Sequence, residues 1–590
     1  MAETVLGTAE GLLAGLDPEQ REVAVAARGP VCVLAGAGTG KTRAITYRIA
    51  YAAAAGLIDP AHVLALTFTV RAAGELRGRL RQLGAGGMGT RQVRASTFHA
   101  AALRQLVYFW PRVVGGRPPQ LIDAKAPLIR EAAKRAQIRL DAPGSISDTG
   151  GEIEWAKVNQ VRPDGYPAAA AAAGRMTGSA AERVAAVYAE YEQLRRERHL
   201  IDFEAVLELT AGILLDSRAA ADQVRDMFRY FVVDEYQDVN PLQKLLLDAW
   251  LGDRDDLCVV GDPNQVIYSF TGATSSYLTG FTTEFPDATV VRLVRDYRST
   301  PQVVALANQI ARAGVPLVAQ RPPGPRPVLT EFGDDTEEAE GVAVQIQALL
   351  AGGVTAKEIA VLVRVNADTE RFEQALAAAN VPFVIRGAER FYERPVVRQA
   401  LVLLRAAAVG ERADRAAAAS SSAAPDQAPL PASVRHVLAG IGLTSGPSSG
   451  GAAARERWES LAAIAQLADD MYAGNPEATL GEFSAELTQR AEVGHAPAVD
   501  GVTLASIHAA KGLEWDAVML PAMHEGMMPI VHAKTPEAVE EEQRLLYVAV
   551  TRAREHLYLS WCPSRTPGGA RTRVAARQRS RFLDGIRLGR

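Results

Sequence analysis

A glycine-rich loop between an apolar run and a helical run restricts the fold of this chain more than any other feature. The run GPVCVLAG precedes the loop and TRAITYRIAYAAAA follows it. The loop comprises Ala35, Gly36, Ala37, Gly38, Thr39, Gly40, Lys41 and Thr42, and Arg43 continues into the helix. Such a strand–loop–helix unit lets backbone N–H groups and a helix N-terminus surround phosphate oxygens. It predicts a phosphate loop in which Lys41 reaches the β- and γ-phosphates and Thr42 binds Mg²⁺. The alternative is a glycine-rich turn without a ligand.

Short apolar runs around this loop indicate a parallel sheet. The four runs in the first half are Val31–Leu34, Val63–Thr67, Tyr230–Val233 and Leu257–Val260. Each ends in a polar cluster, and helical stretches separate them, which favours a sheet with helices on both faces. In such sheets the chemistry lies at the carboxyl ends of the strands.

A pair of acids follows the third of these runs. Asp234 and Glu235 stand directly after Phe231-Val232-Val233. We expect Asp234 to hold Mg²⁺ and Glu235 to polarise an attacking water. A solvated acidic turn is the alternative for this pair alone. With a phosphate loop on a neighbouring strand, the pair predicts nucleotide hydrolysis.

Composition sets limits without indicating a function. The chain has 590 residues, 48% of them hydrophobic, and a formal net charge of −4. This length predicts three or four folded units, and no apolar run is long enough to span a bilayer. Three cysteines without a CxxC pair support neither a structural zinc nor a disulfide framework. We expect a cytoplasmic protein without membrane contact, and the charge leaves a nucleic-acid partner open.

Further motifs occur in a fixed order along the chain. They are Leu16–Gln20, Leu66–Thr69, Ser96–His99, Val260–Phe270, Asp296–Thr300, Ser506–Glu514 and Glu542–Ala553. From Leu16 to about Leu583 the chain resembles the superfamily 1 DNA helicases of the UvrD/PcrA/Rep type, closest to the actinobacterial second-type UvrD helicases. The resemblance implies ATP and Mg²⁺ as cofactors and DNA as the track.

The resemblance also assigns roles in the nucleotide site. It implies that Gln20 reads adenine, that Tyr297 stacks on it, and that Glu514 lies near the ribose. It makes Gln265 and Arg298 contacts of the γ-phosphate, and Arg552 the arginine finger. Because we place Arg298 and Arg552 on a second α/β unit, we expect them to complete the charge-stabilising shell when a cleft between two units closes.

A second set of residues is expected to contact DNA. The set comprises Phe68, Thr97, His99, Tyr268, Phe270, Asn366, Ser506 and His508. Aromatic rings at strand ends offer a stacking platform for bases of any sequence. Phe68 as an ordinary core residue, and His99 and His508 as interior histidines, remain the alternatives.

The implied fold is α/β, with two RecA-like P-loop parallel-sheet domains, each with a mainly helical insertion. Its expected parts are 1–100 and 203–288 (domain 1A), 101–202 (helical insertion 1B), 289–396 and 499–590 (domain 2A with a basic tail), and 397–498 (a reduced 2B insertion). The low-complexity stretches Arg415–Ser433 and Thr444–Ala454 predict linkers or surface loops in 2B. We expect neither the Cys-rich link nor the helical accessory domain found after the last motif in the nearest relatives.

Several positions depart from the family pattern. Thr271 replaces an Arg, Val70 and Asp296 each replace an Asn, and Phe270 replaces a Trp. None of these belongs to the hydrolytic set.

The leading hypothesis is therefore a 3′-to-5′ single-stranded DNA translocase and helicase acting on 3′-tailed duplex, associated with the nucleoid, in DNA repair or replication. The alternative is a nucleotide-gated DNA-binding or recruitment module that unwinds poorly without a repair-protein partner.

Overall fold

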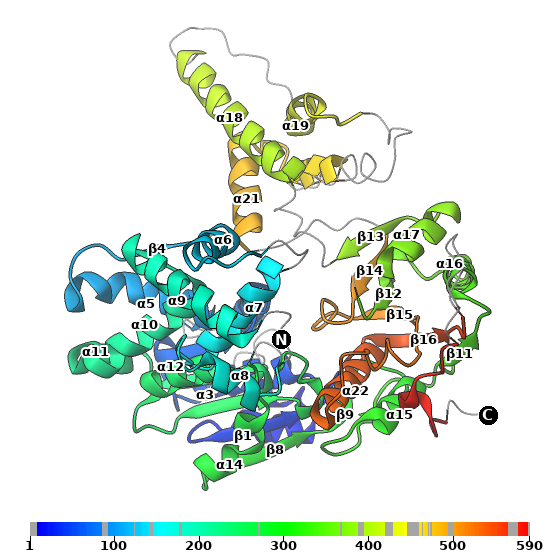
Figure 1. Cartoon of the computed structure of the whole chain (residues 1–590), viewed down its shortest axis with the longest axis horizontal. Helices are drawn as coiled ribbons and strands as arrows, with labels where there is room; N and C mark the ends of the chain where they lie inside the picture. The colour runs from blue at the N-terminus through cyan, green and yellow to red at the C-terminus, as the bar shows by residue number, and fades with distance from the viewer. Residues whose placement is uncertain are drawn as a thin grey trace. The chain divides into compact units, whose positions relative to one another are not determined.

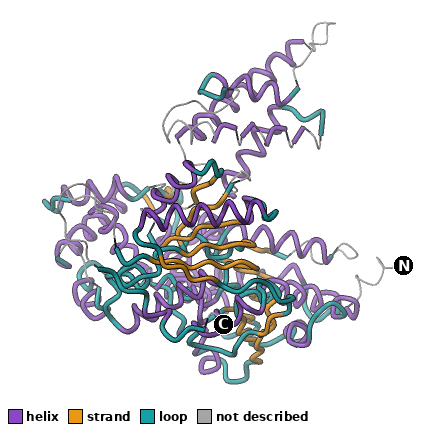
Figure 2. The backbone as a smooth tube through the Cα atoms, turned by 90° about the vertical axis from the view of Figure 1, so that its right-hand side faces the viewer, coloured by secondary structure: helices purple, strands orange, loops and turns teal. Residues whose placement is uncertain are grey.

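The computed structural model describes most of the chain in two compact units. The described residues are 9–84, 93–122, 124–140, 145–175, 180–269, 272–365, 368–386, 395–418, 429–444, 460–462, 464–465, 467–469, 471–472, 475–493, 501–564 and 576–587. The first unit comprises Met1–Pro325, Val531–Thr551 and Gly585–Arg590, and the second comprises Arg326–Ile530 and Arg552–Asp584. Helices make up most of the described chain outside the sheets, as the colouring in Figure 2 shows.

The first unit is built on a parallel sheet. Its six strands, as far as the structure describes them, run in the order β3-β2-β6-β7-β1-β8. They are β1 (Val31–Ala35), β2 (Val63–Thr67), β3 (Arg94–Thr97), β6 (Tyr230–Val233), β7 (Leu257–Gly261) and β8 (Thr289–Leu293). All neighbouring strands pair in parallel. The four strands expected from apolar runs are confirmed.

Two predictions about this sheet are wrong. The second α/β region does not start at Thr289, because β8 pairs with β1 in register from Val31–Thr289 to Ala35–Leu293. β1 and β8 lie side by side in Figure 1 although they are far apart in the sequence. The phosphate loop and the acidic pair are also not on neighbouring strands, because β7 lies between β1 and β6. A run of apolar residues indicates a strand but carries no information on which sheet or position it takes.

Helices cover both faces of this sheet. Those of the first unit are α1 (Ala9–Leu13), α2 (Pro18–Val25), α3 (Lys41–Ala54), α4 (Val70–Leu83), α5 (Phe98–Val113), α6 (Ala126–Arg135), α7 (Ser145–Val158), α8 (Tyr166–Ala172), α9 (Ala181–Glu197), α10 (Phe203–Asp216), α11 (Arg218–Met227), α12 (Pro241–Leu251), α13 (Ser276–Thr279), α14 (Phe281–Glu284), α15 (Pro301–Ile310) and α22 (Pro536–Val550). Ile45 and Ile49 of α3 pack in one apolar core and Leu246 and Trp250 of α12 in another.

The helical insertion has a core of its own. Its buried residues come from α6, α7, α8 and α9, between Leu128 and Leu194. α5 instead packs in the core of the sheet, with Phe98 and Leu106 buried beside α10. The insertion therefore separates from the sheet after α5, later than the expected residue 101. Two-stranded ladders add β4 (Gln120–Leu121) with β5 (Leu200–Ile201), and β9 (Arg295–Asp296) with β10 (Val318–Ala319).

The second unit repeats the parallel-sheet plan. In its described residues a six-stranded sheet has the order β11-β16-β15-β12-β14-β13. The strands are β11 (Val328–Glu331), β12 (Ile359–Val363), β13 (Phe383–Arg386), β14 (Val502–Ser506), β15 (Trp515–Leu520) and β16 (Ala553–Trp561), and the helices α16 (Asp335–Ala351) and α17 (Thr369–Ala378) pack on it. The pairing of β12 with β14 joins residues from the two expected parts of domain 2A, 289–396 and 499–590, in one sheet.

Three longer helices lie between β13 and β14 in the sequence. α18 (Pro395–Ala418), α19 (Leu430–Ala439) and α21 (Leu480–Val493) share an apolar core. The first low-complexity stretch was expected to be linker or loop, but its two ends are helical, in α18 and α19. Alanine is the best helix former, which explains the extension of α18 to Ala418. Residues 419–428 and most of the second stretch lie outside the described residues.

None of the described helices is both long and apolar enough to cross a bilayer.

Candidate active site

The phosphate loop joins β1 to α3 in the first unit. Gly38 and Gly40 have φ values of 70° and 77°, in the left-handed region that glycine adopts without strain. A Cβ atom at Gly38 would also lie 2.5 Å from the carboxylate of Asp296. Gly40 is the N-cap of α3, so the backbone N–H groups of the first helical turn lack intrahelical acceptors. The loop therefore has the backbone geometry and the field that a phosphate requires.

Side chains of the loop are held by carbonyl groups. The hydroxyl of Thr39 donates to Gly36 O at 2.9 Å, and Lys41 Nζ lies 3.5 Å from Ala35 O. Thr42 is partly exposed, and Arg43 is exposed and donates to Gly15 O at 2.7 Å. Lys41 is thus placed at the mouth of the loop, whereas Arg43 is directed to the segment before α2.

Asp17 joins two residues expected to contact the base. Its Oδ1 caps α2 by accepting from Gln20 N at 2.7 Å, and its Oδ2 accepts from the Tyr297 hydroxyl at 2.6 Å. Gln20 is 3% exposed and donates through Nε2 to Thr39 O at 3.2 Å. The ring of Tyr297 is 45% exposed, and burial together with the bond to Asp17 raises its pKa to about 12. A buried amide and an accessible ring next to the phosphate loop suit a purine.

A chain of hydrogen bonds links the acidic pair to the residue expected to sense the γ-phosphate. Gln237 donates to Glu235 Oε2 at 2.5 Å, and its Oε1 accepts from Asp262 N at 3.0 Å. Asp262 in turn accepts from Gln265 Nε2 at 2.8 Å. Glu235 has a φ of 52°, a conformation that costs energy in a residue other than glycine and that is enriched at functional sites. Gln237 was not among the site residues expected from the sequence, although it stands two residues after Glu235.

Buried carboxylates outnumber cations at this edge of the sheet. Burial and the charge of Glu235 raise the pKa of Asp234 to about 7, against the opposing charge of Lys41. Burial also raises the pKa of Asp262. A divalent cation at Asp234 would offset this excess of negative charge. The described residues contain no preformed cluster of three His, Cys, Asp or Glu ligands. A cation held by Asp234, the Thr42 hydroxyl and phosphate oxygens fits this donor set, because Mg²⁺ in phosphate sites uses few protein ligands.

Arg298 lies on the first unit, which corrects its expected place on the second. It follows β9 in the same unit as Lys41. Its backbone N–H donates to Asp296 Oδ1 at 2.7 Å, and its Nη1 donates to Thr551 O at 3.2 Å. The chain does not cross to the second unit until Pro325, because β8 completes the first sheet.

Two aromatic rings lie parallel after the ends of β2 and β7. The ring centroids of Phe68 and Tyr268 are 6.3 Å apart and their planes differ by 7°. Phe68 is 39% exposed, so it is not an ordinary core residue. Phe270 and Asn366, expected to extend this surface, lie outside the described residues, as does Thr271. The structure therefore brings two of the expected stacking rings together.

The neighbouring segment combines a helix cap with a histidine. Thr97 caps α5 by accepting from Ala100 N at 3.2 Å. Burial lowers the pKa of His99 to about 4, so this imidazole is neutral at physiological pH. Its ring meets the ring of Phe203 edge to face at 5.8 Å, and Phe203 is 48% exposed. Sequence reasoning did not select Phe203, because it belongs to none of the motifs that carry the family resemblance.

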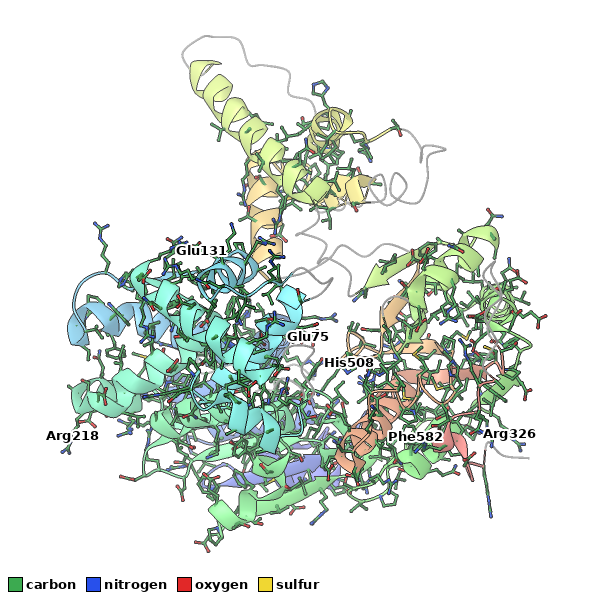
Figure 3. The ribbon with its side chains drawn as sticks, in the orientation of Figure 1. Glu75, Glu131, Arg218, Arg326, His508 and Phe582 are labelled. Carbon is green, nitrogen blue, oxygen red and sulfur yellow. The ribbon has the colours of Figure 1, made fainter. Side chains whose placement is uncertain are left out.

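The second unit holds the remaining expected residues. Arg552 is 2% exposed and donates to Leu513 O at 3.0 Å. The carboxylate of Glu514 accepts from Arg554 Nη2 at 2.9 Å. Ser506 ends β14, and His508 lies in the loop that follows (Figure 3). Burial and the charge of Arg364 lower the pKa of His508 to about 4.

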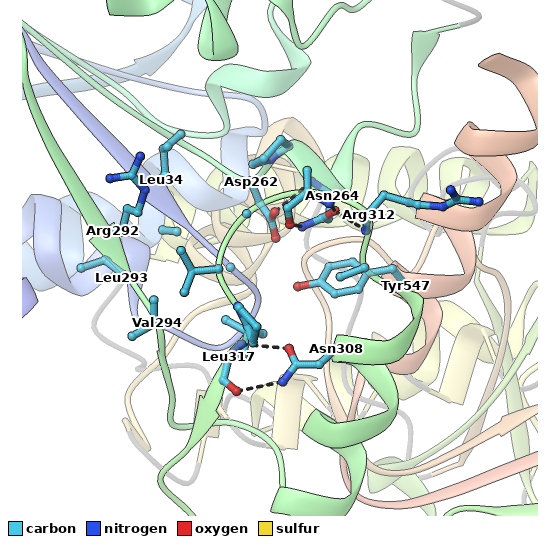
Figure 4. A pocket seen from close by; sticks show the side chains of 18 residues that line it. Leu34, Asp262, Asn264, Arg292, Leu293, Val294, Asn308, Arg312, Leu317 and Tyr547 are labelled. Atoms are coloured by element: carbon cyan, nitrogen blue, oxygen red, sulfur yellow. Dashed lines mark hydrogen bonds between the residues drawn. The ribbon is translucent and has the colours of Figure 1, made fainter. Parts of the chain in front are cut away.

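A cavity of about 140 Å³ lies within the first unit, behind the start of the phosphate loop. Figure 4 shows Asp262 and Asn264 on one side of it and Tyr547 of α22 on another. Leu34 and Gly36 form part of the wall. Helix α22 therefore reaches the segment that carries Gln265.

A phosphate loop on a parallel sheet, with two acids and a polar sensor at the same edge, defines a P-loop nucleoside triphosphatase. Comparison with known proteins identifies the group within this class. The chain matches the UvrD/REP helicase N-terminal domain over residues 16–286 and the UvrD-like helicase C-terminal domain over residues 291–418 and 445–564. It belongs to the UvrD/Rep helicase family, and its two sheets are RecA-like domains.

Similar proteins agree with this assignment. The chain is 51% identical to the ATP-dependent DNA helicase UvrD2 of Mycobacterium tuberculosis, over 98% of this chain and 82% of the relative. It is 29% identical to the ATP-dependent DNA helicase UvrD1 of Mycobacterium leprae, over 95% of this chain and 84% of the relative. It is 27% identical to the ATP-dependent DNA helicase PcrA of Staphylococcus epidermidis, over 98% of this chain and 87% of the relative.

Proposed function

We propose that this chain is an ATP-driven DNA helicase that moves 3′ to 5′ along single-stranded DNA and separates a duplex with a 3′ tail. The observation that supports this best is the chain of hydrogen bonds from Glu235 to Gln265, which ends in the loop that carries Tyr268. These hydrogen bonds connect the residue proposed to activate water for ATP hydrolysis to the loop whose Tyr268 ring is proposed to stack on bases. The direction is carried over from the family resemblance.

In this proposal the first unit binds the nucleotide. Gln20 and Tyr297 hold the base, and Lys41 and the N-terminus of α3 hold the phosphates. Asp234 and Thr42 hold Mg²⁺, which supplies charge neutralisation at the phosphates when bound. Glu235 orients and polarises the attacking water, and Gln237 fixes its carboxylate.

The second unit contributes charge and further contacts. Arg552 acts as the arginine finger, and Glu514 lies near the ribose. Because Arg298 belongs to the first unit, Arg552 becomes the principal cation that the second unit adds to the transition state. Its arrival and departure once per ATP supply the mechanical step.

The track is a line of rings and polar groups. Phe68 and Tyr268 stack on bases, each contact being worth about 1–3 kcal/mol, and Phe203 adds a further exposed ring. We assign DNA contacts to Thr97, His99, Ser506 and His508 as well, with both histidines acting as neutral hydrogen-bonding groups. The similar proteins are named as DNA helicases, which supports DNA over RNA as the track. We place the enzyme on nucleoid DNA, in repair or replication.

A test measures ATP hydrolysis with and without single-stranded DNA, alongside strand separation on 3′-tailed and 5′-tailed duplexes. We expect stimulation by single strands and separation of the 3′-tailed substrate. The opposite polarity would refute the direction, and hydrolysis that ignores DNA would refute the motor.

The alternative is a nucleotide-gated DNA-binding or recruitment module. The strained conformation of Glu235 argues against it, because a module without turnover needs no positioned base. A Glu235→Gln variant distinguishes the two: a motor loses the displacement of DNA-bound proteins, and a gated module retains it.

A further inference from the structure

The loop that carries Tyr268 is held by helix α22. Ser269 N donates to Glu541 Oε1 at 3.0 Å, and the Ser269 hydroxyl donates to the other oxygen of the same carboxylate. On the other side of Tyr268, Arg544 Nε donates to Val266 O at 2.9 Å. The residues before and after Tyr268 are thus fixed by two charged side chains from one turn of α22, and charged partners make the stronger hydrogen bonds.

The same turn of α22 is tied to the end of α15. Gln543 Nε2 donates to Ile310 O at 2.8 Å, and its Oε1 accepts from Arg312 Nε at 2.8 Å. The segment after α15 is in turn bound by Asn264, which donates to Ala313 O at 2.7 Å and accepts from Ala313 N at 3.0 Å. Figure 4 shows Asn264, Arg312 and Tyr547 around the same cavity. Because Gln543 joins α22 to the end of α15 in the same unit, α22 has contacts with the fold besides those with the loop.

An anchored helix can set the position of a loop. Tyr268 lies between Val266, which Arg544 holds, and Ser269, so the orientation of its ring depends in part on what holds Ser269. Glu541 supplies that hold with two hydrogen bonds. It is not placed to touch nucleotide or DNA itself, because its carboxylate is engaged by Ser269.

We propose that Glu541 is a positioning residue for base stacking: by holding Ser269 it fixes the ring of Tyr268 parallel to Phe68, and so determines how much single-stranded DNA is needed to stimulate ATP hydrolysis. This inference rests on the proposed function. It assigns α22, the helix that precedes Arg552, a role in placing the ring of Tyr268 that is proposed to stack on DNA bases.

The test compares Glu541→Ala with Glu540→Ala, an exposed acid one position earlier on the same helix with the same change of charge. In the full chain, Glu541→Ala raises the concentration of single-stranded DNA at half-maximal ATP hydrolysis about tenfold, as expected for the loss of a charge-assisted pair of hydrogen bonds. The rate at saturating DNA changes much less. Glu541→Gln, which keeps an acceptor oxygen, recovers most of the loss, and Glu540→Ala stays within about twofold of the unmodified chain.

A second arm separates positioning from a general effect on folding. If Glu541 acts through Tyr268, then Glu541→Ala adds nothing in a chain that already carries Tyr268→Leu. Quenching of 2-aminopurine in a short single strand reports the stacking directly, and it weakens in Glu541→Ala. Thermal unfolding of each variant shows whether the fold is kept.

Each outcome bears on a separate statement. If DNA stimulates the unmodified chain and Glu541→Ala behaves like Glu540→Ala, the inference is overturned and the proposed function stands. Equal effects of Glu541→Ala with and without Tyr268→Leu also overturn it. If DNA does not stimulate the unmodified chain at all, the proposed function fails and the inference fails with it.

Discussion

The fully buried amide of Gln237 connects Glu235, the proposed catalytic carboxylate, to Asp262 and through it to Gln265, the proposed sensor. Replacing it by methionine keeps the volume and removes both hydrogen bonds. We expect the maximal rate of ATP hydrolysis to fall about tenfold with little change in KM, because positioning is lost and binding is kept. Gln223→Met, at an exposed position on α11, is the matched control. A larger change in KM than in rate would show that Gln237 serves nucleotide binding instead.

Asp234 predicts a pH-dependent demand for Mg²⁺. Its pKa is raised to about 7 by burial and by Glu235, so without metal it gains a proton as the pH falls below 7. The proton and the cation compete for the carboxylate, and the free Mg²⁺ needed for half-maximal hydrolysis should therefore rise from pH 8 to pH 6. The measurement is a Mg²⁺ titration at saturating ATP at both pH values. A constant requirement would remove Asp234 from the metal site.

His99 predicts a loss of stability in acid. Its pKa is about 4 in the folded chain, below the ordinary value of 6.5, because burial disfavours the charged form. The unfolded chain therefore binds the proton first, and stability is lost as the pH falls from 6.5 towards 4, by about 2 kcal/mol at pH 5. The drop in Tm between pH 7 and pH 5 should be smaller in His99→Gln. It should be unchanged in His532→Gln, which replaces an exposed histidine of the same unit.

Some of the individual contacts in the site could be predicted from the sequence, and others could not. The phosphate loop could be predicted because its strand, glycines and helix are contiguous in the sequence. The bridge through Gln237 and the hold of Glu541 on Ser269 could not, because each joins segments whose proximity depends on the order of strands and helices. Phe203 was missed because it belongs to none of the family motifs, and an apolar pattern cannot show which aromatic ring stays exposed.

At the scale of elements, the helical insertion is tied to α10 by a buried ionic network. Lys157 Nζ lies 2.9 Å from Asp202 Oδ2 and 2.7 Å from Glu192 Oε1, and its side chain is 3% exposed. Although burial opposes ionisation, Lys157 and Arg195 hold the pKa of Asp202 at about 2. The network fixes the residue that caps α10, beside Phe203.

Removing the lysine leaves the buried carboxylate of Asp202 without the cation that it contacts, while Glu192 keeps its ion pair with Arg195. We expect Lys157→Met to destabilise the chain by about 3 kcal/mol, whereas Lys134→Met, at an exposed position on α6, changes stability by less than about 0.5 kcal/mol. Thermal unfolding measures both. Similar Tm values for the two variants would show that the network contributes specificity without stability.

The sequence predicted the presence of strands more reliably than the sheet to which each strand belongs. β1, β2, β6 and β7 were expected from apolar runs, and the structure confirms them. Residues from 289 onward were assigned to the second sheet-containing domain, but Thr289–Leu293 forms β8 of the first sheet, because hydrogen bonding between β1 and β8 joins residues about 260 positions apart. The low-complexity stretch Arg415–Ser433 was expected to be a linker or loop, but its two ends are helical. Alanine-rich sequence is compatible with both linker and helix.

For the whole molecule, the assignment of the two arginines to different units makes a prediction. Arg298 belongs to the first unit and Arg552 to the second. We expect Arg552→Ala to reduce DNA-stimulated hydrolysis by about 10³-fold while the affinity for a fluorescent ATP analogue stays close to that of the unmodified chain. Arg298→Ala should weaken both. Equal losses of nucleotide affinity in the two variants would contradict this division.

The path of the chain between the units has a practical consequence. The chain crosses at Pro325–Arg326, Ile530–Val531, Thr551–Arg552 and Asp584–Gly585. A fragment ending at Pro325 would lack α22, which forms a wall of the cavity through Tyr547. Chimaeras that exchange amino-terminal halves between relatives would therefore combine a motor body from one protein with a supporting helix from another. Grafts that carry residues 531–551 along with the first half should keep the native fit.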